Sequence, residues 1–458
     1  MARTSSLASV HIDVAEDPQP QPRREPDSPF RILVAGDFSG GASRIRKPVQ
    51  VDRDNFDEVL ALFAPELGLY FAGTRVPVRF RELEDFHPDR LFQRLAPFQA
   101  LRDLRRRVAE GSALPDATPP PPPPPKLSGA DVLRSMMGEG AAPGAAQAAA
   151  APARSEWDQM LHNLVAPYAE PKPDPRTPQY LKQTDAAITG VMCGVLHQAG
   201  FQSLEAALRG LHFLIRRLAT GESLKVFAWD IPQDAIATAE GLALLRRIVV
   251  EEAAGTLGAD PWSAIAGLYY FGPQHEGALL EIAAMARQAG APFLSGVAPD
   301  VVGITRVFDG LRRSPDARWI GMALPRFLLR TPYGAKGDST EEFEFEEMAA
   351  PPQHESYLWA NPSLACAYLL GDAFARYGWE MRPGAVSQID GLPVHTYKDG
   401  HESVVKPCAE VLLTEEAVEF LLERGFMPLV SFKDSDRVRL ARFQSVAAPA
   451  APLAGPWA

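Results

Sequence analysis

The chain has very few cysteines and no long apolar run. Only Cys193, Cys366 and Cys408 occur in 458 residues, and they are far apart and odd in number. No disulfide framework is therefore expected, and this cysteine usage is typical of the reducing cytosol. No run approaches the roughly 20 apolar residues that cross a bilayer, and residues 1–13 do not have the pattern of a signal peptide. We expect a cytoplasmic protein that does not span a membrane.

Common motifs of catalytic, metal and cofactor sites are also lacking. The nine histidines show no spacing of metal ligands. In the segment 36–41, GDFSGG, Phe38 stands where a nucleophile elbow would need serine, and GAKGDS at 334–339 lacks the order of a Walker A loop. We predict structural turns at both places. The sequence predicts no catalytic residue, no metal and no cofactor.

The charge and composition limit which kinds of protein the chain can be. The net charge of −11 argues against nucleic acid or an anionic membrane surface as a partner. With 46% hydrophobic and 22% charged residues, the chain can bury sizeable cores in two or three domains.

Seven consecutive prolines, 119–125, lie in a section rich in proline, alanine and glycine. We expect a disordered linker over 112–156. It separates a domain at 29–111 from a larger domain at 157–446, and a disordered tail is expected over 447–458. Inside the linker, residues 127–137 have the pattern of a short amphipathic helix, which is either a docking peptide or a chance packing element. Its apolar residues are Leu127, Val132, Leu133, Met136 and Met137.

Residues 1–28 form an N-terminal strand and a spacer. Val10, Ile12 and Val14 alternate with polar residues, which predicts a half-buried strand. No hairpin partner lies close by in the sequence, so this strand is expected to pair with something distant or with another chain.

The two halves predict α/β structure. In the first half we expect an apolar strand within 29–41 that ends in a glycine turn, a helix within 51–63 and a short strand at 77–80. Within 85–90, an Asp or His cap ahead of a proline predicts the start of a further helix, with a break at Pro97. In the second half, helices and strands alternate from residue 186 onward, which favours a parallel or mixed sheet. Glutamates at 341–347 alternate with Phe343 and Phe345, which predicts an edge strand with a charged outer face. An enzyme that uses Glu344 to Glu347 or the turn at Gly334 is the weaker alternative.

Three blocks of the first half carry a family resemblance: PFRILVAGDFSG at 29–40, VDRDNFDEVLALFAPEL at 51–67 and FRELEDFHPDRL at 80–91. They resemble the small sheath subunit (TssB/VipA type) of the bacterial type VI secretion system. Blocks such as LHQAGFQSLEAALRGLHFLI at 196–215, ARWIGMALPRFLLRTPYG at 317–334 and YLWANPSLACAYLL at 357–370 resemble the large sheath subunit (TssC/VipB type). The chain thus looks like a natural fusion of the two subunits, which would make their pairing intramolecular.

The resemblance implies two intertwined α/β domains, related to phage tail sheaths, in a non-enzymatic contractile sheath. Its expected partners are other sheath subunits, an inner-tube protein, a baseplate and a ClpV-type ATPase that disassembles the contracted form. The helix at 127–137 is a candidate ATPase docking site, and Val10, Ile12 and Val14 a candidate inter-subunit strand. Family members continue beyond the segment at 432–446, so a C-terminally shortened sheath protein is expected. The alternative is a cap, baseplate adaptor or regulator that binds sheath ends without polymerising.

Overall fold

A computed structural model describes residues 27–41, 47–71, 73–110, 177–252, 260–303 and 307–457. The chain separates into two compact units. The first comprises the residues up to Leu95 and from Thr189 onward, and the second comprises Ala96–Ile188. The predicted strand at 10–14 and the linker at 112–156, with its helix at 127–137, lie outside the described residues.

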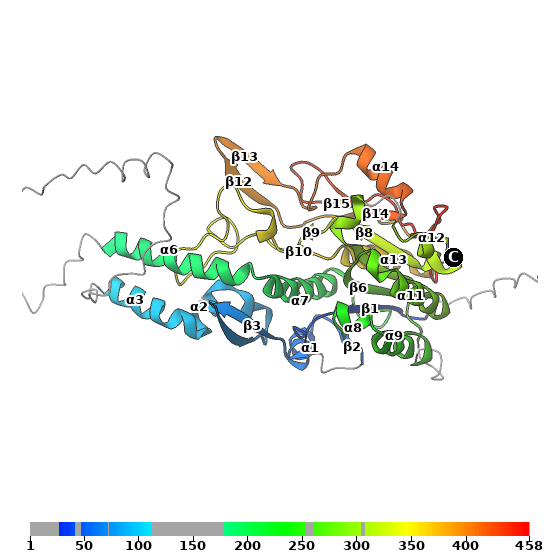
Figure 1. Cartoon of the computed structure of the whole chain (residues 1–458), viewed down its shortest axis with the longest axis horizontal. Coiled ribbons are helices and arrows are strands. Elements are labelled where there is room, and N and C mark those ends of the chain that lie inside the picture. The colour runs from blue at the N-terminus through cyan, green and yellow to red at the C-terminus, as the bar shows by residue number, and fades with distance from the viewer. Residues whose placement is uncertain are drawn as a thin grey trace, which may run out of the picture. The chain divides into compact units, whose positions relative to one another are not determined.

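The elements follow one another along the chain as labelled in Figure 1. The strands are β1 (Phe30–Gly36), β2 (Val49–Val51), β3 (Glu66–Phe71), β4 (Thr74–Arg79), β5 (Leu224–Asp230), β6 (Ala264–Phe271), β7 (Phe293–Val297), β8 (Ile320–Leu324), β9 (Phe327–Leu328), β10 (Trp359–Ala360), β11 (Gln388–Ile389), β12 (His395–Asp399), β13 (Glu402–Lys406), β14 (Phe426–Ser431) and β15 (Val438–Leu440). The α-helices are α1 (Phe56–Phe63), α2 (Pro88–Arg94), α3 (Gln99–Ala109), α6 (Thr177–Leu196), α7 (Ala199–Arg217), α8 (Gln233–Ile236), α9 (Ala239–Arg246), α11 (Glu276–Ala289), α12 (Asp309–Arg313), α13 (Pro362–Tyr377) and α14 (Glu415–Glu423).

One nine-stranded sheet organises the first unit. Its order is β11-β15-β14-β8-β7-β6-β1-β5-β2. Strand β1 pairs in parallel with β5 along its whole length and with β6 on its other side. Strands β7, β8 and β14 continue the parallel part, whereas β2, β15 and β11 are antiparallel to their neighbours. A strand from the first half of the chain is therefore internal to a sheet built mostly by the second half, as expected for intertwined α/β segments.

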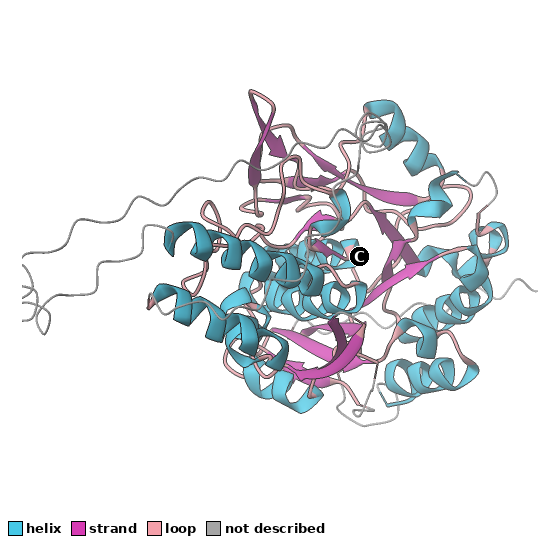
Figure 2. Cartoon of the chain, turned by 60° about the vertical axis from the view of Figure 1, so that its left-hand side comes forward, coloured by secondary structure: helices cyan, strands magenta, loops and turns pink. Residues whose placement is uncertain are grey.

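The sequence of β1 explains its central place. FRILVAG is almost continuously apolar, which is typical of a parallel strand with helices over both faces. Leu33 and Ala35 pack in one core with residues of α9 and α11. Ile32 approaches Gly371 of α13. Figure 2 shows helices around the central strands.

Short-range predictions in the first half are confirmed. The apolar face expected for the first helix, Phe56, Val59, Leu60 and Phe63, is buried in α1. His87 is the N-cap of α2, where its ring accepts a hydrogen bond from Asp89 N, and Pro88 is the first helical residue.

The second unit contains α3 and most of α6. The predicted break near Pro97 is present, because α2 ends at Arg94 and a short 3-10 turn at Ala96–Phe98 precedes α3. Within this unit, Arg105 Nε on α3 donates to Asp185 Oδ1 on α6 at 2.7 Å. None of the helices in the described ranges is long and apolar enough to span a bilayer.

Two expectations about local structure were wrong. Residues 341–347 form no strand, although Phe343 and Phe345 are buried as predicted, and Glu347 is buried with them. The described part of the tail, 447–457, packs on the domain instead of standing free. Its backbone donates to carbonyls of the second half, from Ala448 N to Arg312 O and from Ala454 N to Arg318 O, and the Leu453 side chain is buried. Proline-rich composition here excludes regular secondary structure but not packing.

Candidate functional site at the junction of the two halves

The junction begins with the turn after β1. Asp230, the last residue of β5, accepts hydrogen bonds through Oδ1 from Phe38 N at 2.8 Å and from Ser39 N at 3.1 Å. Asp37 accepts from the backbone N–H groups of Gly40 and Gly41 at 2.8 and 2.9 Å. Gly40 has φ of +80°, and a Cβ there would lie 2.6 Å from Glu66 O. These contacts agree with the predicted structural turn and fix the end of β1 against β5.

A buried cluster of charges holds the segment 330–347 to α7. Glu205, fully buried in α7, accepts from Arg209 Nε at 2.7 Å and from Arg330 Nε at 2.9 Å. Arg330 also donates through Nη1 to Glu347 Oε2 at 2.7 Å. Tyr333 N donates to the same oxygen at 2.8 Å, and the Arg330 guanidinium lies 4.1 Å from the centre of the Tyr333 ring. Two arginines thus balance two buried glutamates.

The electrostatics of Glu347 follow from this cluster. Burial opposes ionisation of its carboxyl, but Arg330, His197 and the Tyr333 N–H outweigh that cost and lower its pKa to about 2. Glu410 is a second case: its burial is outweighed by hydrogen bonds from Arg326 and His354, and its pKa is also about 2. Both carboxylates stabilise the fold only while they are ionised.

Acidification should therefore destabilise the protein. The folded-state pKa of Glu347 is below its ordinary value of 4.5, so its contribution is present at neutral pH and disappears as the pH falls toward 2. We expect a loss of about 2 kcal/mol from Glu347 between pH 6 and pH 3. Urea denaturation at several pH values measures this loss of unfolding free energy. Glu347→Gln should give a flatter pH profile, and an unchanged profile in this variant would contradict the assignment.

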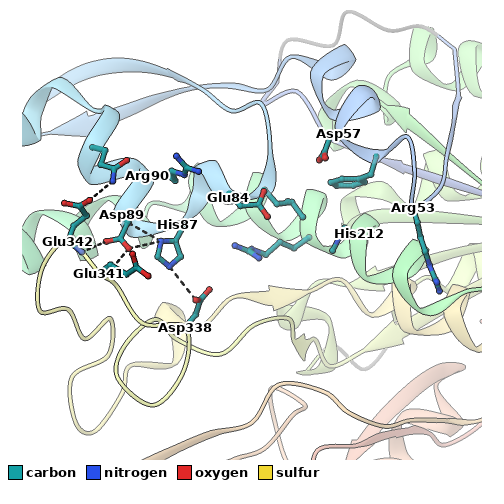
Figure 3. Close-up of a pocket in the computed structure, with 14 residues that line it drawn as sticks. Arg53, Asp57, Glu84, His87, Asp89, Arg90, His212, Asp338, Glu341 and Glu342 are labelled. Carbon is teal, nitrogen blue, oxygen red and sulfur yellow. Dashed lines mark hydrogen bonds and ion pairs between the residues drawn. The ribbon is translucent and has the colours of Figure 1, made fainter.

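A groove of about 600 Å³ lies beside this cluster and is lined by both halves of the chain (Figure 3). The Asp89 carboxylate of α2 accepts from Glu341 N at 2.9 Å and from Glu342 N at 3.2 Å. Gln93 Nε2 donates to Glu342 Oε1 at 2.7 Å. His87 points toward Asp338, with 3.6 Å between Nε2 and Oδ1. These contacts join α2 to the loop that Glu347 anchors.

The far end of the groove contains His212 on α7. Its ring packs edge-on against Phe56 of α1, with 5.0 Å between ring centres. Burial and the nearby Arg216 and Arg209 lower the pKa of His212. Within the described ranges, no group of histidine, cysteine, aspartate and glutamate is arranged to hold a metal ion. The arrangement joins two chain segments and positions no nucleophile beside a base.

The predicted site residues are not part of this junction. Val10, Ile12 and Val14 and the helix at 127–137 are outside the described residues, so both assignments stay predictions. Sequence reasoning missed Glu205 and Arg330, and it singled out Glu347 only as part of an acidic run and not as their ion-pair partner. One signal was present, because Glu205 interrupts the apolar stripe of Phe201, Leu204 and Leu208 and is followed four residues later by Arg209.

Comparisons with known proteins divide the chain in the same way. The family described as EvpB tail sheath N-terminal domain (VipB) matches residues 178–309 and 305–447. The family described as type VI secretion system VipA matches residues 16–112.

Individual relatives are similar over part of the chain. The type VI secretion system sheath protein TssC1 of Pseudomonas aeruginosa is 33% identical over 300 residues, which cover 58% of this chain and 60% of that protein. The contracted helical sheath of the anti-feeding prophage is a structural match with 16% identity and a TM-score of 0.27, covering 51% of this chain and 50% of the other. The two family matches confirm the resemblance found in the sequence. The chain belongs to the VipB family of tail sheath proteins, and ahead of that segment it carries a VipA segment of the type VI secretion system.

Proposed function

We propose that the chain is a structural subunit of a type VI secretion contractile sheath, in which the VipA and VipB segments form one sheath unit. The observation that carries this proposal is the place of β1. A VipA-segment strand lies between β5 and β6 of the VipB segment, so the two segments share one core. Since both belong to the same chain, their pairing occurs at the high effective concentration of an intramolecular contact.

The partners follow from this proposal. The unit assembles with other sheath subunits around an inner-tube protein on a baseplate, in the cytoplasm, and contraction drives the tube and its effectors outward. The chain spans 60% of the length of its TssC1 relative. The protein acts through assembly and not through catalysis.

Electron microscopy of the purified chain tests the proposal, first alone and then mixed with a complete sheath pair and inner tube. Tubes or stacked rings are the expected result. Discrete particles that bind only at the ends of sheaths would instead assign the chain to a cap or adaptor. Particles that neither join nor modify a sheath would reject both assignments.

The strand at 10–14 is proposed to pair with a neighbouring unit. Ile12→Pro removes a backbone N–H donor from this strand and should abolish assembly into tubes without changing the thermal unfolding midpoint. Ile12→Val is the matched control, because it keeps the donor and the strand propensity. Tubes formed equally well by Ile12→Pro would contradict strand donation.

The segment 127–137 is proposed to engage a ClpV-type disassembly ATPase. Its deletion should remove binding of the ATPase in a pull-down, whereas deletion of an equal number of residues at 140–150 should not. Binding that survives the first deletion would contradict this role.

A further inference from the structure

A second cavity, separate from the groove of Figure 3, lies at the carboxyl ends of three parallel strands. It measures about 690 Å³ and is reached from the ends of β1, β5 and β6. Asp37 follows β1, Gln233 follows β5 and Tyr270 lies near the end of β6. The chain places β5 on one side of β1 and β6 on the other, so the connections diverge at this point. In doubly wound sheets, ligands bind in the crevice at such a point.

Two side-chain amides inside the crevice are already paired. The Gln233 side chain donates to Tyr270 O at 2.8 Å and accepts from Tyr270 N at 2.9 Å. Asn361 Nδ2 donates to Tyr269 O at 3.0 Å. These two amides are therefore already engaged with the backbone of β6. Leu268 and Leu364 line its floor, and the aromatic residues Tyr357 and Trp359 are on a wall.

The charged residues around the crevice are mostly acidic. Carboxylates of Asp37, Asp234 and Glu355 line it. The cation among the described lining residues is Arg326, and Glu410 holds its guanidinium at 2.8 Å. Coulomb repulsion disfavours nucleotides and other anions here. The crevice therefore suits a ligand that has a cationic group and a narrow apolar part.

The wall of the crevice on α7 leaves room for the apolar part of such a ligand. Its lining residues are mostly small, including Ala199, Ser203 and Ala206. An extended segment that carries proline next to arginine fits an apolar, aromatic wall and an acidic rim, because proline-rich sequences favour an extended conformation before they bind. Residues 18–26 of this chain have this composition, PQPQPRREP.

We propose that the crevice binds the segment 18–26 of a second copy of this chain, with Arg23 and Arg24 at the acidic rim. The same molecule is poorly placed to supply it, because the segment precedes the amino end of β1 and the crevice lies at the carboxyl end. Strand β1 advances about 23 Å from Phe30 to Asp37, and Asp27 precedes its amino end. Arg24 is six residues ahead of Phe30, a backbone reach of at most about 22 Å, so the chain would have to double back fully extended along the whole strand. The inference rests on the proposed assembly, which brings a second copy into reach.

A peptide of residues 16–28 with a fluorescent label is the probe, titrated against the full chain carrying Arg23→Glu and Arg24→Glu so that the chain's own segment does not compete. We expect saturable binding that weakens with added salt. Asp234→Lys with Glu355→Lys should weaken it about tenfold or more. The matched control, Glu416→Lys with Glu419→Lys on exposed positions of α14, should leave it unchanged. Thermal unfolding checks that each variant is folded.

Charge reversal completes the test. A peptide with both arginines replaced by glutamate should bind the lysine variant better than the parent chain. Equal binding of both peptides to the parent chain, or equal loss in the α14 control, would overturn the proposal. A peptide of residues 115–126 that binds as tightly would assign the crevice to another segment and also overturn it. Peptide binding without tubes would reject the sheath function alone, and tubes without crevice-dependent peptide binding would reject this inference alone.

Discussion

Arg330→Met is expected to lower the free energy of unfolding by about 3–5 kcal/mol. The substitution leaves Glu205 and Glu347 buried without the guanidinium that bridges them. Breaking a buried ion pair from one side is costly because the remaining charge has lost both water and partner. Urea denaturation at pH 7, followed by tryptophan fluorescence, measures the change.

Arg376→Met is the matched control for this prediction. Arg376 lies on the surface of α13 and pairs with Asp372 four residues earlier. An exposed pair of this kind contributes about 0.3–0.5 kcal/mol. A similar small loss for Arg330→Met would contradict the assigned role of the cluster. Adding Glu347→Gln to Arg330→Met should recover part of the stability, since one uncompensated charge is then removed.

What the sequence predicts well is local. The face of α1 follows from apolar spacing of three and four residues, and the start of α2 follows from His87 and Pro88. Each depends on contacts within one turn of chain. The family resemblance supplied the intertwined arrangement, and the observed pairing of β1 with β5 and β6 agrees with it.

Register and partners between distant segments could not be predicted from patterns. The pairing of Phe30 with Leu224 joins residues almost two hundred positions apart, and the pattern within either strand does not specify that partner. The acidic segment 341–347 shows the same limit of prediction from sequence patterns. The alternation of this run correctly predicted that Phe343 and Phe345 are buried. Glu347 points inward because it pairs with Arg330, and only the tertiary fold brings these two residues together. The candidate site was therefore missed.

Val34→Asp is expected to prevent the two segments from forming their shared core. Val34 is fully buried and pairs with Ala228 of β5 on one side and Ala266 of β6 on the other. A carboxylate at this position faces alanine on both neighbouring strands, and its burial costs several kcal/mol. If β1 does not insert, the facing edges of β5 and β6 stay unpaired and promote aggregation.

The measurement is the fraction of soluble, monodisperse chain by size-exclusion chromatography, compared with Val411→Asp. Val411 is 51% exposed, so the same substitution there tests the effect of an added charge without burial. We expect most of the Val34→Asp variant to be found in aggregates. The Val411→Asp variant should elute like the parent chain. Val34→Ala should stay soluble with a lowered unfolding free energy, because it keeps the strand uncharged and removes only packing. Soluble Val34→Asp with the unfolding midpoint of Val411→Asp would show that β1 is not required in the core.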